Sequence, residues 1–256
     1  MQKKISIVNC VSEAHEMLRF SSDFIVRNAG IEGFNYIIVK WRETKEVNNV
    51  IEDLINEHGS KVNIVVVDHE EDKSVGYVPN LRAMMNIGFT KGLELADYVG
   101  LTNTDQCFYI DWLKNLERHV EEDVVVTSTL IEPGPTRHHV ANFGMTTYEY
   151  FHLKSFYDFC QSISNNGFID ETKTSFMNLQ SLPYLFSRKI WNTCGPWELT
   201  LKNGTPDVNF FTRVHLAGFK FKKINDSIAF HLGGIERGAR QNMYKKPKFS
   251  ETMNYE

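Results

Sequence analysis

Two short, oxygen-bearing side chains follow an apolar run near the middle of the chain. The run Tyr98–Thr102 ends in Asn103, Thr104 and Asp105. A turn of this composition can hold a hard divalent cation through its carboxylate, while the oxygens of a diphosphate complete the coordination shell. The alternative is structural: Asn103 and Asp105 would then only form a turn or cap the next helix.

A second carboxylate stands at a predicted helix start in the last quarter of the chain. Thr205 and Pro206 are residue types typical of an N-cap and of a first helical position. Asp207 then lies in the first turn, where the helix dipole favours the ionised carboxylate. Such a group is suited to take a proton from a hydroxyl, and a purely structural aspartate is the alternative.

A histidine ends a later apolar run. The run Ser227–His231 is predicted to be a short strand. Its terminal imidazole could ligate a metal ion, since histidine is a common metal ligand. A lone histidine at such a place is also common as a structural residue, so both interpretations stay open.

Short apolar runs alternate with amphipathic stretches through the first half of the chain. Strands are expected at Ile5–Cys10, Tyr36–Lys40, Val62–Val67, Tyr98–Thr102 and Val124–Leu130, and helices at Glu13–Asn28, Val47–Glu57, Pro79–Leu95 and Ile110–Val120. Valine and isoleucine runs separated by helices are typical of parallel strands buried on both faces. Ligands of such sheets bind beyond the carboxyl ends of the strands, so the residues that follow each strand are the first candidates for a site.

The second half of the chain is less regular. After residue 131 a regular pattern returns at Leu185–Trp191, at a helix Pro206–Leu216, and at two strands, Phe219–Ile224 and Ser227–His231. We find no repeat, low-complexity segment or linker. A single domain is therefore expected.

Composition places the chain among soluble globular proteins. The 28 lysines and arginines against 32 aspartates and glutamates leave a net charge of −4, which offers no electrostatic reason to expect nucleic acid as a partner. No apolar run approaches the ~18 residues of a membrane span. The opening residues have no small-residue cleavage site after them, so we interpret them as a first buried strand rather than a signal peptide.

The four cysteines lack the close spacing of a zinc knuckle or a redox dithiol. Cys10, Cys107, Cys160 and Cys194 are 97, 53 and 34 residues apart. Four buried thiols in a reducing cytoplasm are expected.

Taken in order, these segments resemble the family-two inverting glycosyltransferases of the GT-A fold, over about residues 4–234. Thr102–Gln106 is similar to the family's metal-binding DxD stretch in an Asn-first form. Leu185–Gly195 is similar to the segment that precedes the catalytic helix. Asp207, followed by Arg213 and Gly218, matches the second carboxylate of the family's Glu-Asp motif.

The resemblance implies an α/β fold: a single GT-A-like domain with a mostly parallel, Rossmann-like sheet flanked by helices and an irregular acceptor-side region. Residues 1–130 would form the nucleotide-sugar-binding half. Residues 131–232 would form the acceptor-side and catalytic half, and residues 233–256 a mobile basic tail.

The resemblance also implies a metal-dependent, inverting transfer of a sugar from a UDP-, GDP- or dTDP-sugar to a hydroxyl of a carbohydrate acceptor. Asp105 and His231 would hold Mn²⁺ or Mg²⁺, and Asp207 would deprotonate the acceptor. Trp197 would contact the acceptor. Donor contacts are expected from Cys10, Ser12, Glu13, Trp41, Asp68, Arg82, Asn103, Thr104, Arg237 and Arg240.

The sequence departs from the family pattern at three places. The aspartate that follows the second strand in the family is replaced here by Lys40-Trp41-Arg42, so Trp41 could stack on the donor base or be an ordinary surface residue. The first residue of the Glu-Asp pair is Pro206. The family's Arg-Asn pair appears as Met85-Asn86, and Arg82, one turn earlier, could contact the phosphates or be a solvated helix residue.

Two other function classes remain open. A sugar-nucleotide nucleotidyltransferase would normally carry a glycine-rich basic loop after the first strand, which Cys10-Val11-Ser12-Glu13 is not. A non-catalytic nucleotide-sugar or glycan-binding protein would keep the pocket and lose the base, and the presence of Asp207 argues against it.

Overall fold

The computed structural model describes residues 2–41, 44–70, 72–74, 77–132, 139–140, 151–164, 169–170, 182–199 and 206–232. Arg237, Arg240 and Thr205 lie outside these residues. The helices are α1 (His15–Arg27), α2 (Lys45–His58), α3 (Tyr77–Leu95), α4 (Trp112–Glu117), α5 (Leu153–Ser164), α6 (Arg188–Cys194) and α7 (Pro206–Leu216).

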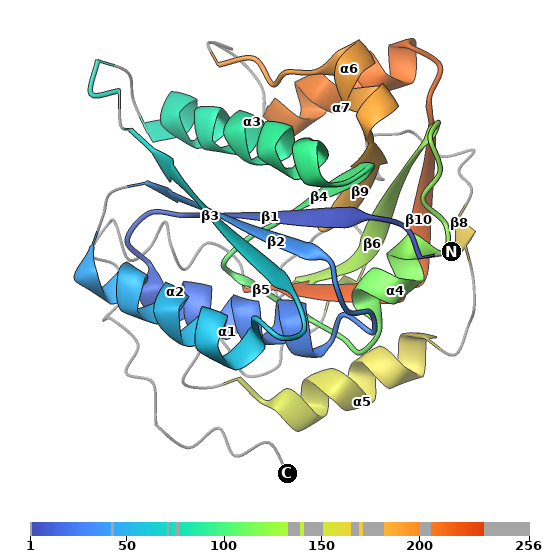
Figure 1. The fold of residues 1–256 in the computed structure, drawn as a ribbon. Helices are drawn as coiled ribbons and strands as arrows, with labels where there is room; N and C mark the ends of the chain where they lie inside the picture. The colour runs from blue at the N-terminus through green and yellow to red at the C-terminus, as the bar shows by residue number, and fades with distance from the viewer. Residues whose placement is uncertain are drawn as a thin grey trace.

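The described strands form one mixed sheet between two layers of helices (Figure 1). They are β1 (Ile5–Val11), β2 (Asn35–Trp41), β3 (Asn63–His69), β4 (Tyr98–Thr102), β5 (Gln106–Phe108), β6 (Val124–Glu132), β7 (His139–Val140), β8 (Ile169–Asp170), β9 (Tyr184–Ser187) and β10 (Lys220–His231). The order is β3-β2-β1-β4-β9-β6-β10-β5, with β7 on β6 and β8 on β10. The expected α/β class and single domain are confirmed.

Strand directions place the ends of most strands at one edge of the sheet. β1 is parallel to β2 and β4, β2 is parallel to β3, and β6 is parallel to β10. β9 lies antiparallel between β4 and β6, so β4 and β6 run in the same direction. The carboxyl ends of β1, β2, β3, β4, β6 and β10 therefore meet at one edge, together with the start of β9. We call it the carboxyl edge.

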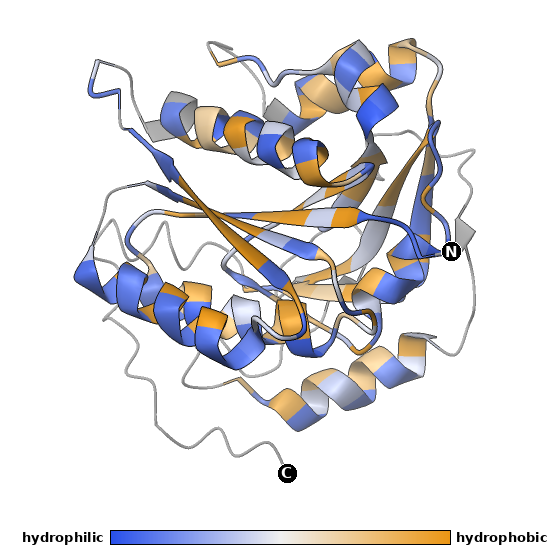
Figure 2. Ribbon diagram, in the orientation of Figure 1, coloured by the Kyte–Doolittle hydropathy of each residue, from blue (hydrophilic) through white to orange (hydrophobic). Residues whose placement is uncertain are grey.

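Two apolar cores explain why the central strands are rich in hydrophobic residues. One core joins the sheet to α1, α2, α4 and α5, and the other joins it to α3, α6 and α7. In Figure 2 apolar residues predominate in the central strands, whereas each helix also carries hydrophilic residues. Burial of both faces is the condition under which strands read as continuous apolar runs rather than as alternating ones.

Two glycines permit close approaches between neighbouring elements. A Cβ atom added at Gly88 of α3 would lie 2.4 Å from Cγ1 of Val8, and one at Gly100 of β4 would lie 2.4 Å from Cδ2 of Leu185. Larger residues at these positions would push α3 off β1 and β9 off β4. The glycines thus fix how α3 and β9 sit on the sheet.

The structure differs from the expected elements in three places. The two strands expected at 219–224 and 227–231 are one strand, β10, with a register shift between Ile224 and Ile228. The helix expected at 110–120 is the shorter α4. β5, which is not among the expected strands, pairs antiparallel with β10.

The cysteines are thiols, as expected, although Cys10 is only half-buried while the other three are buried. Among the described helices, none has both the length and the apolar character needed to cross a bilayer.

Candidate active site

Asp105 and His231 lie in direct contact at the carboxyl edge. Oδ2 of Asp105 is 2.9 Å from Nε2 of His231. The Asp105 residue is 8% exposed. The backbone holds the pair together, because His231 lies opposite Gln106 in the antiparallel β10–β5 ladder and Leu232 N–H donates to the Asp105 carbonyl at 2.9 Å. The short antiparallel pairing of β5 with β10 thus brings together two side chains that lie 126 residues apart in the sequence.

The side chain of Gln106 holds the turn that carries Asn103 and Asp105 through hydrogen bonds. Its side chain is 1% exposed, accepts from Asn103 N–H at 3.0 Å and donates to the Leu182 carbonyl at 3.1 Å. A buried amide that satisfies two backbone groups at once holds both segments in register. Sequence reasoning missed this residue, since nothing in its spacing reveals a partner 76 residues away.

Asp207 is in the first turn of α7, as expected from Pro206. The helix ends four residues before β10 starts at the opposite edge, so its N-terminal turn points toward the carboxyl edge. Oδ1 of Asp207 accepts from Val208 N–H at 2.9 Å. Phe211, one turn later on the same helix face, packs edge-on against Tyr184 with ring centroids 4.9 Å apart.

The pKa of the Tyr184 phenol reflects the groups that lie near its hydroxyl. Burial raises this pKa well above its ordinary value, and the carboxylate of Asp207 and the thiol of Cys10 raise it further. Both groups therefore lie within electrostatic reach of the Tyr184 hydroxyl. Cys10, at the end of β1, and Asp207 are thus brought toward the same part of the carboxyl edge.

The other candidate donor residues of the strand ends also lie at this edge. Ser12 is buried and Glu13 exposed just beyond β1, and Thr104 is buried in the turn after β4. Asp68, near the end of the outermost strand β3, is exposed and pairs with Lys40 at 3.1 Å. The structure thus brings these strand ends to one edge of the sheet.

Arg82 is buried and bound to the protein backbone in this structure. It is 4% exposed, and its Nη1 donates to the carbonyls of Glu198 and Leu199 at 3.3 and 3.1 Å. Asn86, one turn later, exchanges two hydrogen bonds of 2.8 and 2.9 Å with the backbone of Trp197. The two residues bind the loop after α6 to α3, so Arg82 is not a solvated helix residue, and its contact with the donor phosphates stays a prediction.

Both tryptophans proposed as ligand contacts are core residues. Trp41 is 2% exposed and Trp197 is 3% exposed, and both belong to the core on the α3, α6 and α7 side. Trp197 packs against Phe89 and Phe210, with ring centroids 5.8 and 6.1 Å apart. Neither ring presents a face to solvent, so the structure does not support base stacking by Trp41 or an acceptor contact by Trp197.

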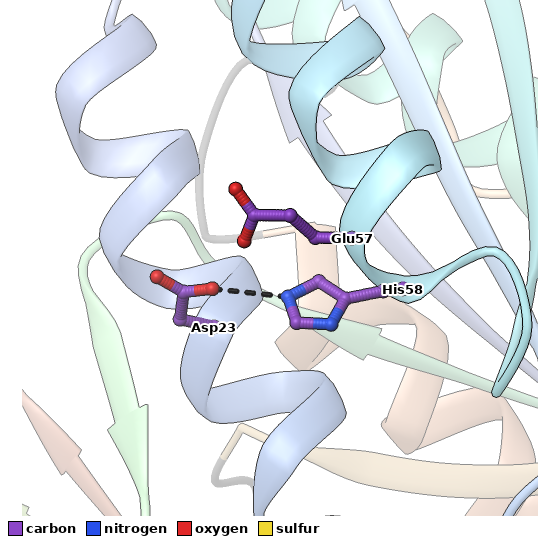
Figure 3. Close-up of side chains that lie close together, drawn as sticks. All are labelled: Asp23, Glu57 and His58. Carbon is purple, nitrogen blue, oxygen red and sulfur yellow. Dashed lines mark hydrogen bonds and ion pairs between the residues drawn. The ribbon is translucent and has the colours of Figure 1, made fainter.

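A second group of possible metal ligands lies between α1 and α2. Asp23, Glu57 and His58 have their ligand atoms within 4.8 Å of one another (Figure 3). Arg19 contacts Glu57 at 2.5 Å and Asp23 at 3.3 Å, and Arg27 contacts Asp23 at 3.7 Å. Two guanidinium groups already neutralise these carboxylates, so the cluster fits an ion-pair network that joins the two helices.

A surface pocket of about 390 Å³ opens at the opposite edge of the sheet. It lies at the start of β4 and the end of β9, where Asp97 and Ser187 line it. None of the residues predicted to contact the metal ion, the donor or the acceptor lines it.

Comparisons with known proteins identify the fold. No protein-family model matches the sequence, and no curated protein matches it. Among solved structures, S. aureus TarS residues 1–349 has a TM-score of 0.60 at 12% identity over 89% of this chain and 60% of that one. The same protein in complex with UDP has a TM-score of 0.61 at 12% identity, with the same two shares covered.

A mannosyltransferase shares the fold as well. PcManGT from Pyrobaculum calidifontis, in complex with GDP-Man and Mn²⁺, has a TM-score of 0.56 at 11% identity over 91% of this chain and 57% of that one. The chain thus spans about 60% of the length of these structures, and 36% of a longer TarS structure that it also resembles. Its fold is that of glycosyltransferase structures.

Proposed function

We propose that this chain transfers a sugar from a nucleotide-sugar donor to a hydroxyl group of a carbohydrate acceptor, with a divalent metal ion and with inversion at the anomeric carbon. The observation that carries the proposal is that one edge of the sheet gathers Asp105, His231 and the helix turn of Asp207. The fold supports it, because similar structures were solved with UDP or with GDP-Man and Mn²⁺.

The Asp105–His231 pair fits a divalent cation. Adjacent ligands of an octahedral ion with bonds of ~2.1 Å lie about 3 Å apart, and the Oδ2–Nε2 distance is 2.9 Å. A carboxylate and an imidazole suit Mn²⁺, whereas Mg²⁺ prefers oxygen ligands alone. The same distance also fits a plain hydrogen bond, so metal titration is needed to distinguish the two. A bound ion would neutralise charge on the leaving diphosphate.

The chain's own side chains would orient the donor and accept the proton of the acceptor hydroxyl. The Asn103–Asp105 turn, held by Gln106, would orient the donor at the end of β4. Asp207 would accept the proton of the acceptor hydroxyl at its carboxylate as that hydroxyl attacks the sugar from the face opposite the leaving group. General-base catalysis of this kind contributes ~10²–10⁴ in rate.

A panel of UDP-, GDP- and dTDP-sugars tests the proposal. Each is incubated with the protein and Mn²⁺, and release of nucleoside diphosphate is measured with and without EDTA. Metal-dependent release supports transfer or its partial reaction, donor hydrolysis. Pyrophosphate release from a nucleoside triphosphate and a sugar phosphate would instead indicate a nucleotidyltransferase, and binding without turnover would indicate a binding module.

A further inference from the structure

Tyr184 occupies a central position under the proposed catalytic helix. It is the first residue of β9, and its backbone lies opposite Leu101 of β4 and Thr127 of β6. Its side chain is 1% exposed and packs against Phe211 of α7 and Phe186 of β9. The ring thus fills the core between the sheet and the helix that carries Asp207.

The hydroxyl of Tyr184 has no hydrogen-bond partner among the described residues, although the atom is fully buried. Buried tyrosine hydroxyls usually find a partner, because an unpaired polar group keeps its full desolvation penalty. Tyr36, equally buried in the other core, follows this rule and bonds Ser22 at 2.7 Å. A phenylalanine at 184 would fill the same space without the penalty, so packing alone does not explain the hydroxyl.

Two observations place Asp207 near the Tyr184 side chain. Asp207 and Phe211 are four residues apart on one face of α7, and Phe211 packs edge-on against the Tyr184 ring. The carboxylate of Asp207 also raises the pKa of the Tyr184 phenol, after the larger effect of burial. Among the described residues, Asp207 accepts a single hydrogen bond, from Val208 N–H to Oδ1.

We propose that Tyr184 is a positioning residue for Asp207, with its hydroxyl donating to a bound water molecule that in turn donates to the Asp207 carboxylate. The proposal rests on the proposed role of Asp207 as base. A buried water needs two or more polar partners, and the phenol and the carboxylate provide them. The water would keep the carboxylate aimed at the acceptor without sharing its proton-accepting role.

The variant Tyr184→Phe, which removes only the hydroxyl, tests the proposal. We expect a Tm close to that of the wild-type protein, because the bridging water leaves together with the hydroxyl and returns to bulk solvent. We expect kcat to fall on the order of tenfold with donor KM unchanged, since misaligned catalytic groups cost rate rather than binding. An unchanged kcat, or a lowered Tm with unchanged kcat, would overturn it.

Tyr36→Phe is the matched control. It removes a phenol of equal burial whose hydroxyl has a protein partner, Ser22. The opposite pattern is expected: a lower Tm, because Ser22 loses its partner, and an unchanged kcat. If kcat falls in both Tyr184→Phe and Tyr36→Phe, the cause is a general disturbance of the sheet. This result would also overturn the proposal.

A high-resolution crystal structure of the wild-type protein separates this proposal from the proposed function. An ordered water that bonds both the Tyr184 hydroxyl and the Asp207 carboxylate supports the geometry even if no nucleotide sugar is turned over. A protein group in hydrogen-bond contact with that hydroxyl contradicts it, whatever the activity. Absence of turnover with every donor would count against the proposed function alone.

Discussion

The Asp105 carboxylate and the His231 imidazole lie 2.9 Å apart at the point where β5 and β10 pair. Asp105 immediately precedes β5 and His231 ends β10, and the ladder between these two strands fixes the separation of the two side chains. A side-chain pair held by paired backbones is pre-organised, so little conformational entropy is lost when a ligand joins it.

Removal of either side chain is expected to abolish metal binding at this edge. Asp105→Asn and His231→Ala should each lower Mn²⁺ affinity by at least about 100-fold, since loss of a second-shell partner alone costs 10–100-fold. Isothermal titration with MnCl₂ in the presence of a nucleoside diphosphate measures this. Glu57→Gln, in the α1–α2 cluster, is the control and should leave the affinity unchanged; the reverse pattern would move the metal site to that cluster.

Gln106→Glu is expected to weaken both the fold and the donor site. The carboxylate still accepts from Asn103 N–H but places an oxygen against the Leu182 carbonyl, where Gln106 donates. A buried pair of acceptors without a donor costs about 1–3 kcal/mol. Urea denaturation should show that loss, and donor KM should rise. Gln161→Glu, the same change at an exposed site, should alter neither.

Arg82→Met is expected to affect stability more than donor binding. The substitution leaves the carbonyls of Glu198 and Leu199 without their donor, at a cost of about 1–3 kcal/mol. Arg118→Met, an exposed charge loss, controls for net charge. If nucleoside diphosphate affinity instead fell more than tenfold in Arg82→Met alone, the arginine would contact the phosphates after all.

Stability is expected to fall at alkaline pH. Burial raises the pKa of Cys107 and of Tyr184 well above their ordinary values, so both stay neutral in the folded chain while the unfolded chain ionises. The unfolded state gains from ionisation once the pH passes ~8.5 for cysteine and ~10 for tyrosine. Tm should therefore decline above these values, and less steeply in Cys107→Ala and Tyr184→Phe. A flat profile up to pH 11 would contradict this.

Much of the fold could be predicted because strands buried on both faces have an unmistakable composition. The runs at β1, β2, β4 and β6 are continuous in apolar residues, and each element lies within a few residues of its expected bounds. β5 and β9 escaped prediction for a physical reason. They have three and four residues, too few for a period to appear, and their antiparallel insertion depends on contacts distant in sequence.

Some residues of the candidate site could likewise be predicted from the sequence, and others could not. Residues that follow strands, such as Asp105 and His231, could be placed together because parallel strands end at a common edge. Residue type alone does not reveal burial: here Arg82 binds backbone carbonyls and Trp197 fills a core. Gln106 and Tyr184 were missed because their partners lie on other segments of the chain.

The most direct test of the account compares Asp207→Asn with the wild-type protein in donor binding and sugar transfer. The substitution preserves shape and removes the base, so the affinity for the donor with Mn²⁺ should stay nearly unchanged while transfer falls by ~10²–10⁴. Transfer at the wild-type rate in Asp207→Asn would contradict the assignment of the base, and with it the proposed mechanism.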